Sequence, residues 1–177
     1  MRPNEGRRGE RAVVVTGASS GIGKAIALHL AQSGYLVFAG VRRPEDDAAL
    51  RDEAGQDADL VLPVRLDVTV QEDVCAVADT VRERGTPLAG VVNNAGIAVA
   101  APLEFVPLED LRRQFEVNVV GAVATIQALM PQVRQAGGRL VIIGSISGLV
   151  SSRVLGAYAA SKFAIEAISD ALRRELA

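Results

Sequence analysis

Apolar residues gather in five short runs along the chain, and each run is followed by a longer segment of mixed polarity. The runs are almost continuously apolar, which is typical of strands buried on both faces of a parallel sheet. The segments between them carry apolar residues at helical spacing, and several end at glycine, as helices often do. We therefore expect strands at residues 12–15, 36–39, 60–66, 88–92 and 139–143, and helices at 21–32, 45–54, 70–84, 108–134 and from 158 to the end.

Strands that alternate with helices predict β-α-β units with right-handed crossovers, and so an α/β fold with a doubly wound parallel sheet in a single domain. Residues 1–10 read as a flexible tail and residues 11–177 as the domain itself, although Pro63 weakens the third strand. The last helix is still running at Ala177, and a fifth strand at the sheet edge would be exposed. We expect a chain that is incomplete at its C-terminus or whose edge a partner covers.

The composition excludes several classes of protein. The chain has 177 residues, 49% of them hydrophobic and 23% charged, with a net charge of −2, which suits one globular domain without a nucleic-acid or membrane-binding surface. Its start is too polar for a signal peptide, and a single cysteine, Cys75, cannot form an intrachain disulfide, so we expect a cytoplasmic protein. Cys75 fits an apolar helical pattern and is expected in the core. The single histidine, His29, has no clustered partners, so no metal site is expected.

A glycine-rich segment, T-G-A-S-S-G-I-G at residues 16–23, lies between the first strand and the first helix. Gly17 would allow a tight turn, Gly21 would let the backbone approach a pyrophosphate, and Gly23 would let helix and strand pack closely, as in a dinucleotide-binding Rossmann fold. The spacing G-x-x-x-G-x-G differs from the common G-x-G-x-x-G, and a glycine-rich turn without chemical meaning remains the alternative. The expected cofactor contacts in this segment are Gly17, Ser19, Ser20, Gly21, Ile22 and Gly23.

The end of the second strand bears on the choice of cofactor. An acidic residue there would bind the ribose hydroxyl of NAD, whereas an arginine would accommodate the 2′-phosphate of NADP. The segment reads Ala-Gly-Val-Arg-Arg at residues 39–43 and carries no acid, so we expect NADP, with Arg42 on the phosphate, rather than NAD. The alternative is that Arg42 and Arg43 are ordinary surface charges.

Candidate catalytic residues come late in the chain. Tyr158 and Lys162 stand four apart, on one face of the expected helix, and Ser145 follows the fifth strand. A free phenol has a pKa of about 10, and a nearby ammonium favours its ionised form, so the pair could move a proton to or from a carbonyl oxygen. Each residue also has a structural interpretation. Ser145 could cap a turn, although Ser147 is better placed for that, and Lys162 could be a surface lysine.

Together these segments resemble the classical short-chain dehydrogenase/reductase (SDR) family over nearly the whole chain. The matching motifs are T-G-A-S-S-G-I-G at 16–23, L-D-V-T at 66–69, N-N-A-G at 93–96, V-N-V-V-G at 117–121, G-S-I-S-G at 144–148 and Y-A-A-S-K at 158–162. The resemblance implies a catalytic tetrad of Asn118, Ser145, Tyr158 and Lys162, with Asn118 locally interrupting its helix. It also implies cofactor contacts from Asp67, Val68, Asn94, Ala95, Gly96, Tyr158 and Lys162, and in the family the lysine holds the nicotinamide ribose. Asn93 could either contact the ligand or stitch the sheet together.

The implied function is that of an NADP-dependent oxidoreductase that interconverts a carbonyl and a secondary alcohol, with Tyr158 as general acid or base. The segments at 98–103 and 149–155 are mostly apolar, which favours a lipophilic substrate. Apolar positions on the last two helices predict a homodimer or homotetramer. Family members continue with two more strands and a substrate lid, so we expect weak cofactor binding and slow turnover from this chain. The alternative is a catalytically silent nucleotide-binding or interaction module.

Overall fold

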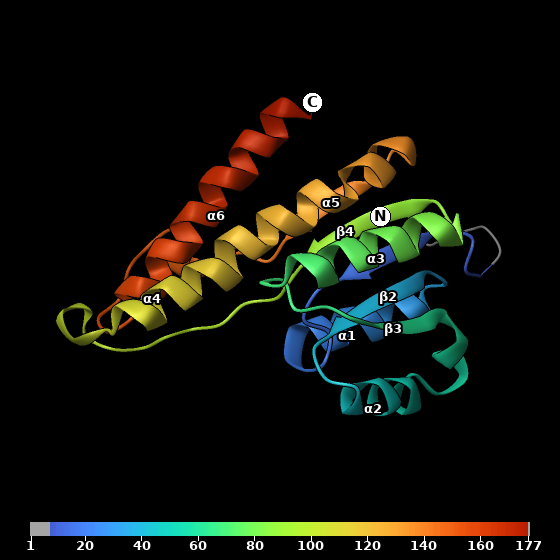
Figure 1. Cartoon of the computed structure of the whole chain (residues 1–177), viewed down its shortest axis with the longest axis horizontal. Helices are drawn as coiled ribbons and strands as arrows, with labels where there is room; N and C mark the ends of the chain where they lie inside the picture. The colour runs from blue at the N-terminus through green and yellow to red at the C-terminus, as the bar shows by residue number, and fades with distance from the viewer. Residues whose placement is uncertain (1–7, 177) are drawn as a thin grey trace.

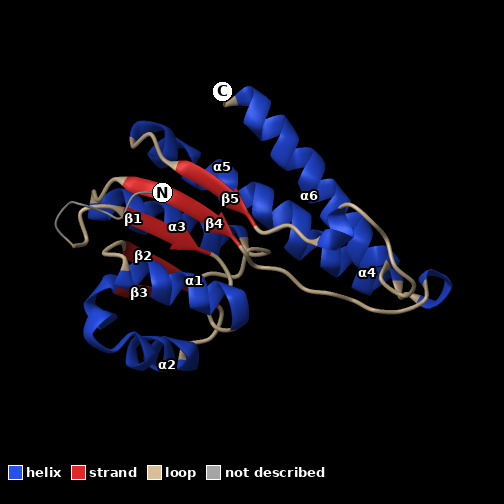
Figure 2. Cartoon of the chain, turned by 180° about the vertical axis from the view of Figure 1, so that it is seen from behind, coloured by secondary structure: helices blue, strands red, loops and turns tan. Residues whose placement is uncertain are grey.

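The computed structural model describes residues 8–176, and most of the expected tail lies outside these residues. They form a five-stranded parallel sheet with the strand order β3-β2-β1-β4-β5 and helices on both faces (Figures 1 and 2). This order places the reversal of winding between β1 and β4, as the doubly wound arrangement requires. The strands are β1 (Ala12–Val15), β2 (Leu36–Val41), β3 (Val61–Arg65), β4 (Leu88–Asn93) and β5 (Arg139–Ile142).

The five strands confirm the apolar runs, and the central three are buried along their whole length. Val14 of β1 pairs with Phe38 of β2 on one side and with Val91 of β4 on the other. β3 lies at the sheet edge and pairs with β2 alone, where Pro63 stands opposite Ala39. A proline is tolerated there because an edge strand can spare one backbone donor.

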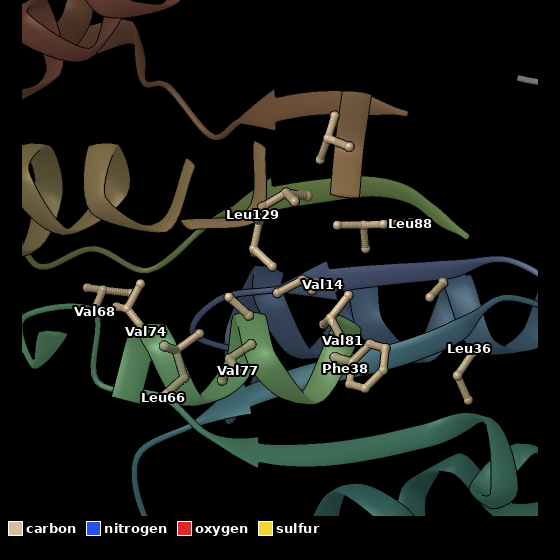
Figure 3. Packing of buried hydrophobic residues seen from close by; sticks show 14 residues of the cluster. Val14, Leu36, Phe38, Leu66, Val68, Val74, Val77, Val81, Leu88 and Leu129 are labelled. Carbon is tan, nitrogen blue, oxygen red and sulfur yellow. The ribbon is translucent and has the colours of Figure 1, made fainter. Parts of the chain in front are cut away.

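The helices divide between the two faces of the sheet. α1 and α2 cover one face, and α3 and α5 cover the other (Figures 1 and 2). Figure 3 shows side chains of β1 and β2, such as Val14 and Phe38, packed toward Val77 and Val81 of α3 and toward Leu129 of α5. The helices span α1 (Gly21–Gln32), α2 (Glu45–Ala54), α3 (Gln71–Arg84), α4 (Leu108–Phe115), α5 (Gly121–Gln135) and α6 (Gly156–Glu175).

Cys75 is exposed on α3, so the prediction that it lies in the core was wrong. The buried stripe of α3 is formed by Val74, Val77, Ala78 and Val81. Cys75 follows Val74 directly, and one residue turns a helix by about 100°, which takes its side chain off that stripe.

The predicted single helix over 108–134 is interrupted. α4 ends at Phe115, a π-helical turn occupies Glu116–Val120, and α5 then runs past Pro131 to Gln135. The turn contains Asn118, where the family resemblance, though not the apolar pattern, implied a local break. Such π turns widen a helix by one residue and are frequent at functional sites.

α6 packs against α4, the π turn and a short 3₁₀ turn, Ile146–Gly148, while its C-terminal end stands away from the sheet (Figures 1 and 2). β5 is the second sheet edge, as expected, and Val141 is 46% exposed there. A groove of about 380 Å³ separates β5 from the last turns of α6. Within residues 8–176, no helix combines the length and the apolarity that a bilayer crossing demands.

Two helical glycines offer a test of this packing. At Gly121, the first residue of α5, an added Cβ would lie 2.7 Å from Val68 Cγ2 and 2.8 Å from Val68 O. We expect Gly121→Ala to lower the free energy of unfolding by about 1–3 kcal/mol, because overpacking outweighs the gain in helix propensity. Urea denaturation measures the change.

Gly156→Ala is the matched control, since Gly156 opens α6 and its Cβ would meet Leu103 Cδ1 at an ordinary 3.7 Å. This variant should be neutral or slightly more stable than the wild type. Equal denaturation midpoints for the two variants would contradict the close packing of α5 on the segment after β3.

Candidate functional site

The glycine turn after β1 is too tightly packed for side chains at two of its positions. Gly17 has φ +66°, and its Cβ would lie 2.9 Å from Ala95 Cα. A Cβ on Gly23 would lie 2.2 Å from Gly17 O, so the first turn of α1 rests directly on the glycine turn. Beside Gly21 there is open space: apart from its chain neighbours and the backbone of its own helix turn, no described residue lies within 4 Å of its Cβ position. This geometry suits a pyrophosphate at the start of α1.

Thr16 and Asn94 hold the glycine turn against the end of β4. Thr16 Oγ1 accepts the N–H groups of Asn94 (3.0 Å) and Ala95 (2.9 Å). Asn94 Nδ2 donates to Thr16 O (3.0 Å) and Gly17 O (3.1 Å). The side chain of Asn94 therefore braces the turn, a structural role that the sequence analysis did not assign to it. Sequence reasoning missed Thr16. Its position, at the end of the strand and just before Gly17, could have predicted a hydroxyl that binds the backbone of the glycine turn's neighbours.

A cleft of about 420 Å³ opens at the carboxyl ends of the strands, where doubly wound folds bind ligands. It brings together the glycine turn, the end of β2, the segment after β3, the segment after β4, the end of α4 and the π turn. Most of the expected cofactor residues line it: Gly17, Ser19, Ser20, Ile22, Arg42, Asp67, Val68, Asn94, Ala95 and Gly96. Sequence reasoning missed further lining residues, among them Thr69, Ile97, Arg113 and Val117. The four tetrad residues are not among its lining residues.

Hydrogen bonds and nearby charges at one end of the cleft favour the ionised form of Asp67. Partial burial opposes its ionisation, but hydrogen bonds from Thr69 Oγ1 (2.7 Å) and Thr69 N–H (3.0 Å), with the nearby Arg42 and Arg65, hold the pKa of Asp67 below its usual value. The carboxylate thus fixes the segment after β3 and lies within the field of Arg42.

The two arginines after β2 differ in their surroundings. Arg43 Nε lies 3.9 Å from Glu45 Oε1 and 3.5 Å from Asp46 Oδ2 at the start of α2. Arg42 lines the cleft. Of the pair, Arg42 is therefore placed to meet an anionic ligand there.

Tyr158 and Lys162 lie on the first turns of α6, close to the end of β5. Lys162 is 7% exposed, and its Nζ donates to Ile143 O at 2.8 Å. The same Nζ lies 5.9 Å from the centroid of the Tyr158 ring. Burial lowers the pKa of Lys162, and the Glu166 carboxylate one turn further along α6 partly opposes this. The surface-lysine interpretation of Lys162 is therefore wrong, because its ammonium is buried beside a phenol.

Asn118 connects the π turn to the Tyr158 turn. Its side chain is 3% exposed, with Oδ1 accepting Ile97 N–H (2.8 Å) and Nδ2 donating to Ile97 O (2.9 Å). Nδ2 also donates to Ser161 Oγ (3.0 Å), whose hydroxyl donates to Tyr158 O (2.7 Å). Ser161 was missed by sequence reasoning, although it is the serine of the Y-A-A-S-K motif. This chain of bonds fixes the start of α6 relative to the segment after β4.

Ser145 caps the 3₁₀ turn that follows β5. Its Oγ accepts the N–H of Ser147 at 3.1 Å, so the capping role considered for Ser147 belongs to Ser145 itself. A hydroxyl that accepts this bond keeps its proton for a second partner. Ser145 stands two residues after Ile143, whose carbonyl accepts the bond from Lys162. The Ser145 hydroxyl and the Lys162 ammonium therefore both lie near the end of β5.

Comparison with known proteins identifies a family that shares this fold. A family model described as short chain dehydrogenase matches residues 11–177. The mitochondrial D-beta-hydroxybutyrate dehydrogenase of Rattus norvegicus is 38% identical in an alignment of 173 positions that covers 94% of this chain and 50% of the relative. A solved short-chain dehydrogenase from Streptomyces avermitilis superposes with a TM-score of 0.87 at 36% identity, over 98% of this chain and 62% of that one.

A third similar protein is a solved alcohol dehydrogenase from Thermococcus sibiricus in complex with 5-hydroxy-NADP. It has a TM-score of 0.88 and 31% identity, over 93% of this chain and 71% of its own. The chain spans about half the length of the curated relative from rat. The family model nevertheless covers the glycine turn, the π turn and the Tyr158–Lys162 pair, and the chain belongs to the short-chain dehydrogenase family.

Proposed function

We propose that this protein is an NADP-dependent oxidoreductase that interconverts a carbonyl compound and a secondary alcohol. The observation that carries the proposal is the buried Lys162 ammonium, 5.9 Å from the Tyr158 ring and bonded to Ile143 O at the end of β5. Burying a lysine is costly unless the charge serves a purpose, and here it faces a group that can exchange a proton. The family's named dehydrogenases support the same reading.

The chemistry divides between cofactor and protein. A bound nicotinamide supplies or accepts the hydride. Tyr158 donates a proton to the carbonyl oxygen during reduction and, as the phenolate, removes it from the alcohol during oxidation. The Lys162 ammonium stabilises the phenolate, and the Ser145 hydroxyl holds the substrate oxygen. Asn118 keeps the Tyr158 turn in place through Ser161.

The preference for NADP rests on Arg42. Arg42 lines the cleft beside Asp67, while Arg43 faces the acidic start of α2. The guanidinium of Arg42 would bind a 2′-phosphate with charge-assisted hydrogen bonds. The Thermococcus sibiricus alcohol dehydrogenase, crystallised with an NADP derivative, supports this choice.

The substrate side favours a lipophilic compound. Segments 98–103 and 149–155 meet where Ala101 N–H donates to Val154 O at 2.8 Å. Large apolar side chains there face solvent, including Leu103, Leu149, Val150 and Val154. We propose that these residues form an apolar wall against which the substrate binds.

We further propose a homodimer or homotetramer that works in the cytoplasm. An apolar groove of about 510 Å³ lies between α5 and α6, lined chiefly by Val123, Ile126, Met130, Ile168 and Leu172. A second copy of these helices would cover this apolar surface, as helix pairs do in symmetric oligomers.

Replacement of Tyr158 tests the proton transfer. Tyr158→Phe keeps the ring but removes the proton donor, so turnover of NADPH with a panel of lipophilic ketones should fall by about 100-fold or more. NADPH should still bind with an affinity, followed by its fluorescence, within about tenfold of the wild type, because the ring is kept and most of the expected cofactor contacts line a cleft to which Tyr158 does not contribute. Tyr35→Phe, at the other tyrosine of the chain, is the control and should keep full turnover. NADPH binding without turnover by the wild type would favour a silent nucleotide-binding module.

Replacement of Arg42 tests the cofactor choice. Arg42→Ala should weaken NADPH binding by about tenfold or more, because one charged hydrogen-bonding partner of the phosphate is lost, and should leave NADH binding unchanged. Arg43→Ala is the matched control and should change neither dissociation constant by more than about twofold. Tighter binding of NADH than NADPH by the wild type would contradict the assignment.

The buried ammonium predicts how stability depends on pH. Burial lowers the pKa of Lys162 from 10.5, so between the lowered value and 10.5 the unfolded chain holds a proton that the folded chain has released. The free energy of unfolding attributable to Lys162 therefore rises with pH through that window. Relative to Lys162→Met, which cannot titrate, the wild type should gain stability in urea denaturation as the pH rises toward 10.5. If the difference in unfolding free energy between the wild type and Lys162→Met stays constant or shrinks as the pH rises, the ammonium is not desolvated.

A further inference from the structure

Gln114 is a fully buried polar side chain near the site, and the proposed function gives it no role. It lies on α4 with none of its surface exposed. Its Oε1 accepts the N–H of Val99, in the segment that follows β4. A fully buried amide in an amphipathic helix is unusual, because glutamine is mostly found at the surface.

Gln114 and Asn118 act on the same segment from neighbouring turns. Asn118 Oδ1 accepts Ile97 N–H at 2.8 Å, and Gln114 Oε1 accepts Val99 N–H. Two side-chain amides four residues apart therefore hold two backbone N–H groups that are two residues apart. This amide clamp, formed by Gln114 and Asn118, fixes residues 97–99 against α4 and the π turn.

The unpaired donor of Gln114 indicates that its acceptor oxygen is the functionally important atom. Its Nε2 is buried and has no hydrogen-bond partner among the residues that the structure describes. An apolar side chain of similar length would fill the same space without leaving a donor unpaired. What Gln114 adds over such a residue is the acceptor oxygen for Val99.

The clamped segment forms part of the site. Ile97 lines the cofactor cleft and is bonded to Asn118, which reaches the Tyr158 turn through Ser161. We propose that Gln114 is a positioning residue, whose acceptor oxygen fixes the segment after β4 so that Asn118 and the cleft wall keep their places. Its effect on turnover rests on the proposed function, whereas its effect on the segment does not.

Amide hydrogen exchange on the 177-residue chain tests the clamp directly. Gln114→Met removes the acceptor but keeps the length of the side chain, so the Val99 amide should exchange about tenfold faster or more. Turnover of NADPH with a ketone should fall by about tenfold, because small displacements at a site cost rate. Gln114→Glu retains an acceptor oxygen and, at an acid pH where the carboxyl is neutral, should restore slow exchange at Val99.

Gln132→Met is the matched control. Like Gln114, Gln132 makes a side-chain hydrogen bond, from Nε2 to Ala78 O at 3.1 Å. It also leaves one buried atom, Oε1, without a partner among the described residues. Unlike Gln114, it lies on α5 away from the cleft. Its replacement should leave Val99 exchange and turnover within about twofold of the wild type.

Wild-type exchange and turnover in Gln114→Met would overturn the inference, as would an equal effect from Gln132→Met or a failure of Gln114→Glu to restore protection. A wild-type chain that does not bind NADPH would overturn the proposed function instead. The Val99 exchange comparison would still decide the role of Gln114.

Discussion

The burial of the Lys162 ammonium is the constraint on which the arrangement of the site depends. A buried charge needs hydrogen-bonding partners, and the carbonyl of Ile143 at the end of β5 provides one. The bond from this ammonium therefore ties the early part of α6 to the end of β5, while α6 as a whole stands off the sheet (Figure 1). Ser145 follows Ile143 by two residues, and the Lys162 ammonium also lies 5.9 Å from the centroid of the Tyr158 ring. The buried ammonium thus connects the helix that carries Tyr158 with the segment that carries Ser145.

The glycine turn beside the cleft is held by hydrogen bonds between neutral groups. Thr16 and Asn94 exchange bonds between the ends of β1 and β4, the two strands at which the winding of the sheet reverses. The glycine turn is held by these bonds and by direct contact of Gly23 with Gly17. A turn fixed in this way presents its backbone N–H groups without reorganisation, which is what tight binding of a phosphate needs.

Much of this structure could be predicted from the sequence, because the relevant signals are local. Apolar runs predicted all five strands, and the i,i+4 spacing predicted that Tyr158 and Lys162 share a face. What the sequence did not reveal depends on contacts between distant segments. Thr16 binds Asn94 across 78 residues, and Gln114 binds Val99 across a loop. Cys75 was misplaced because an apolar pattern does not fix helix phase to within one residue.

The residues that break local rules gather around one end of the sheet. Asn118 interrupts a helix, Lys162 is buried, Gln114 leaves a donor unpaired, and Val154 adopts φ +59°, which costs a β-branched residue about 1–3 kcal/mol. Selection for stability alone would favour another residue at each of these four positions. Away from this end of the sheet, β1, β2 and β4 follow the expected apolar patterns. Val154 lies between Ser145 and Tyr158, and its carbonyl accepts the bond from Ala101 that joins the two apolar segments. Local costs that converge on one place are what a functional site produces, because the geometry needed for chemistry differs from the geometry of lowest energy.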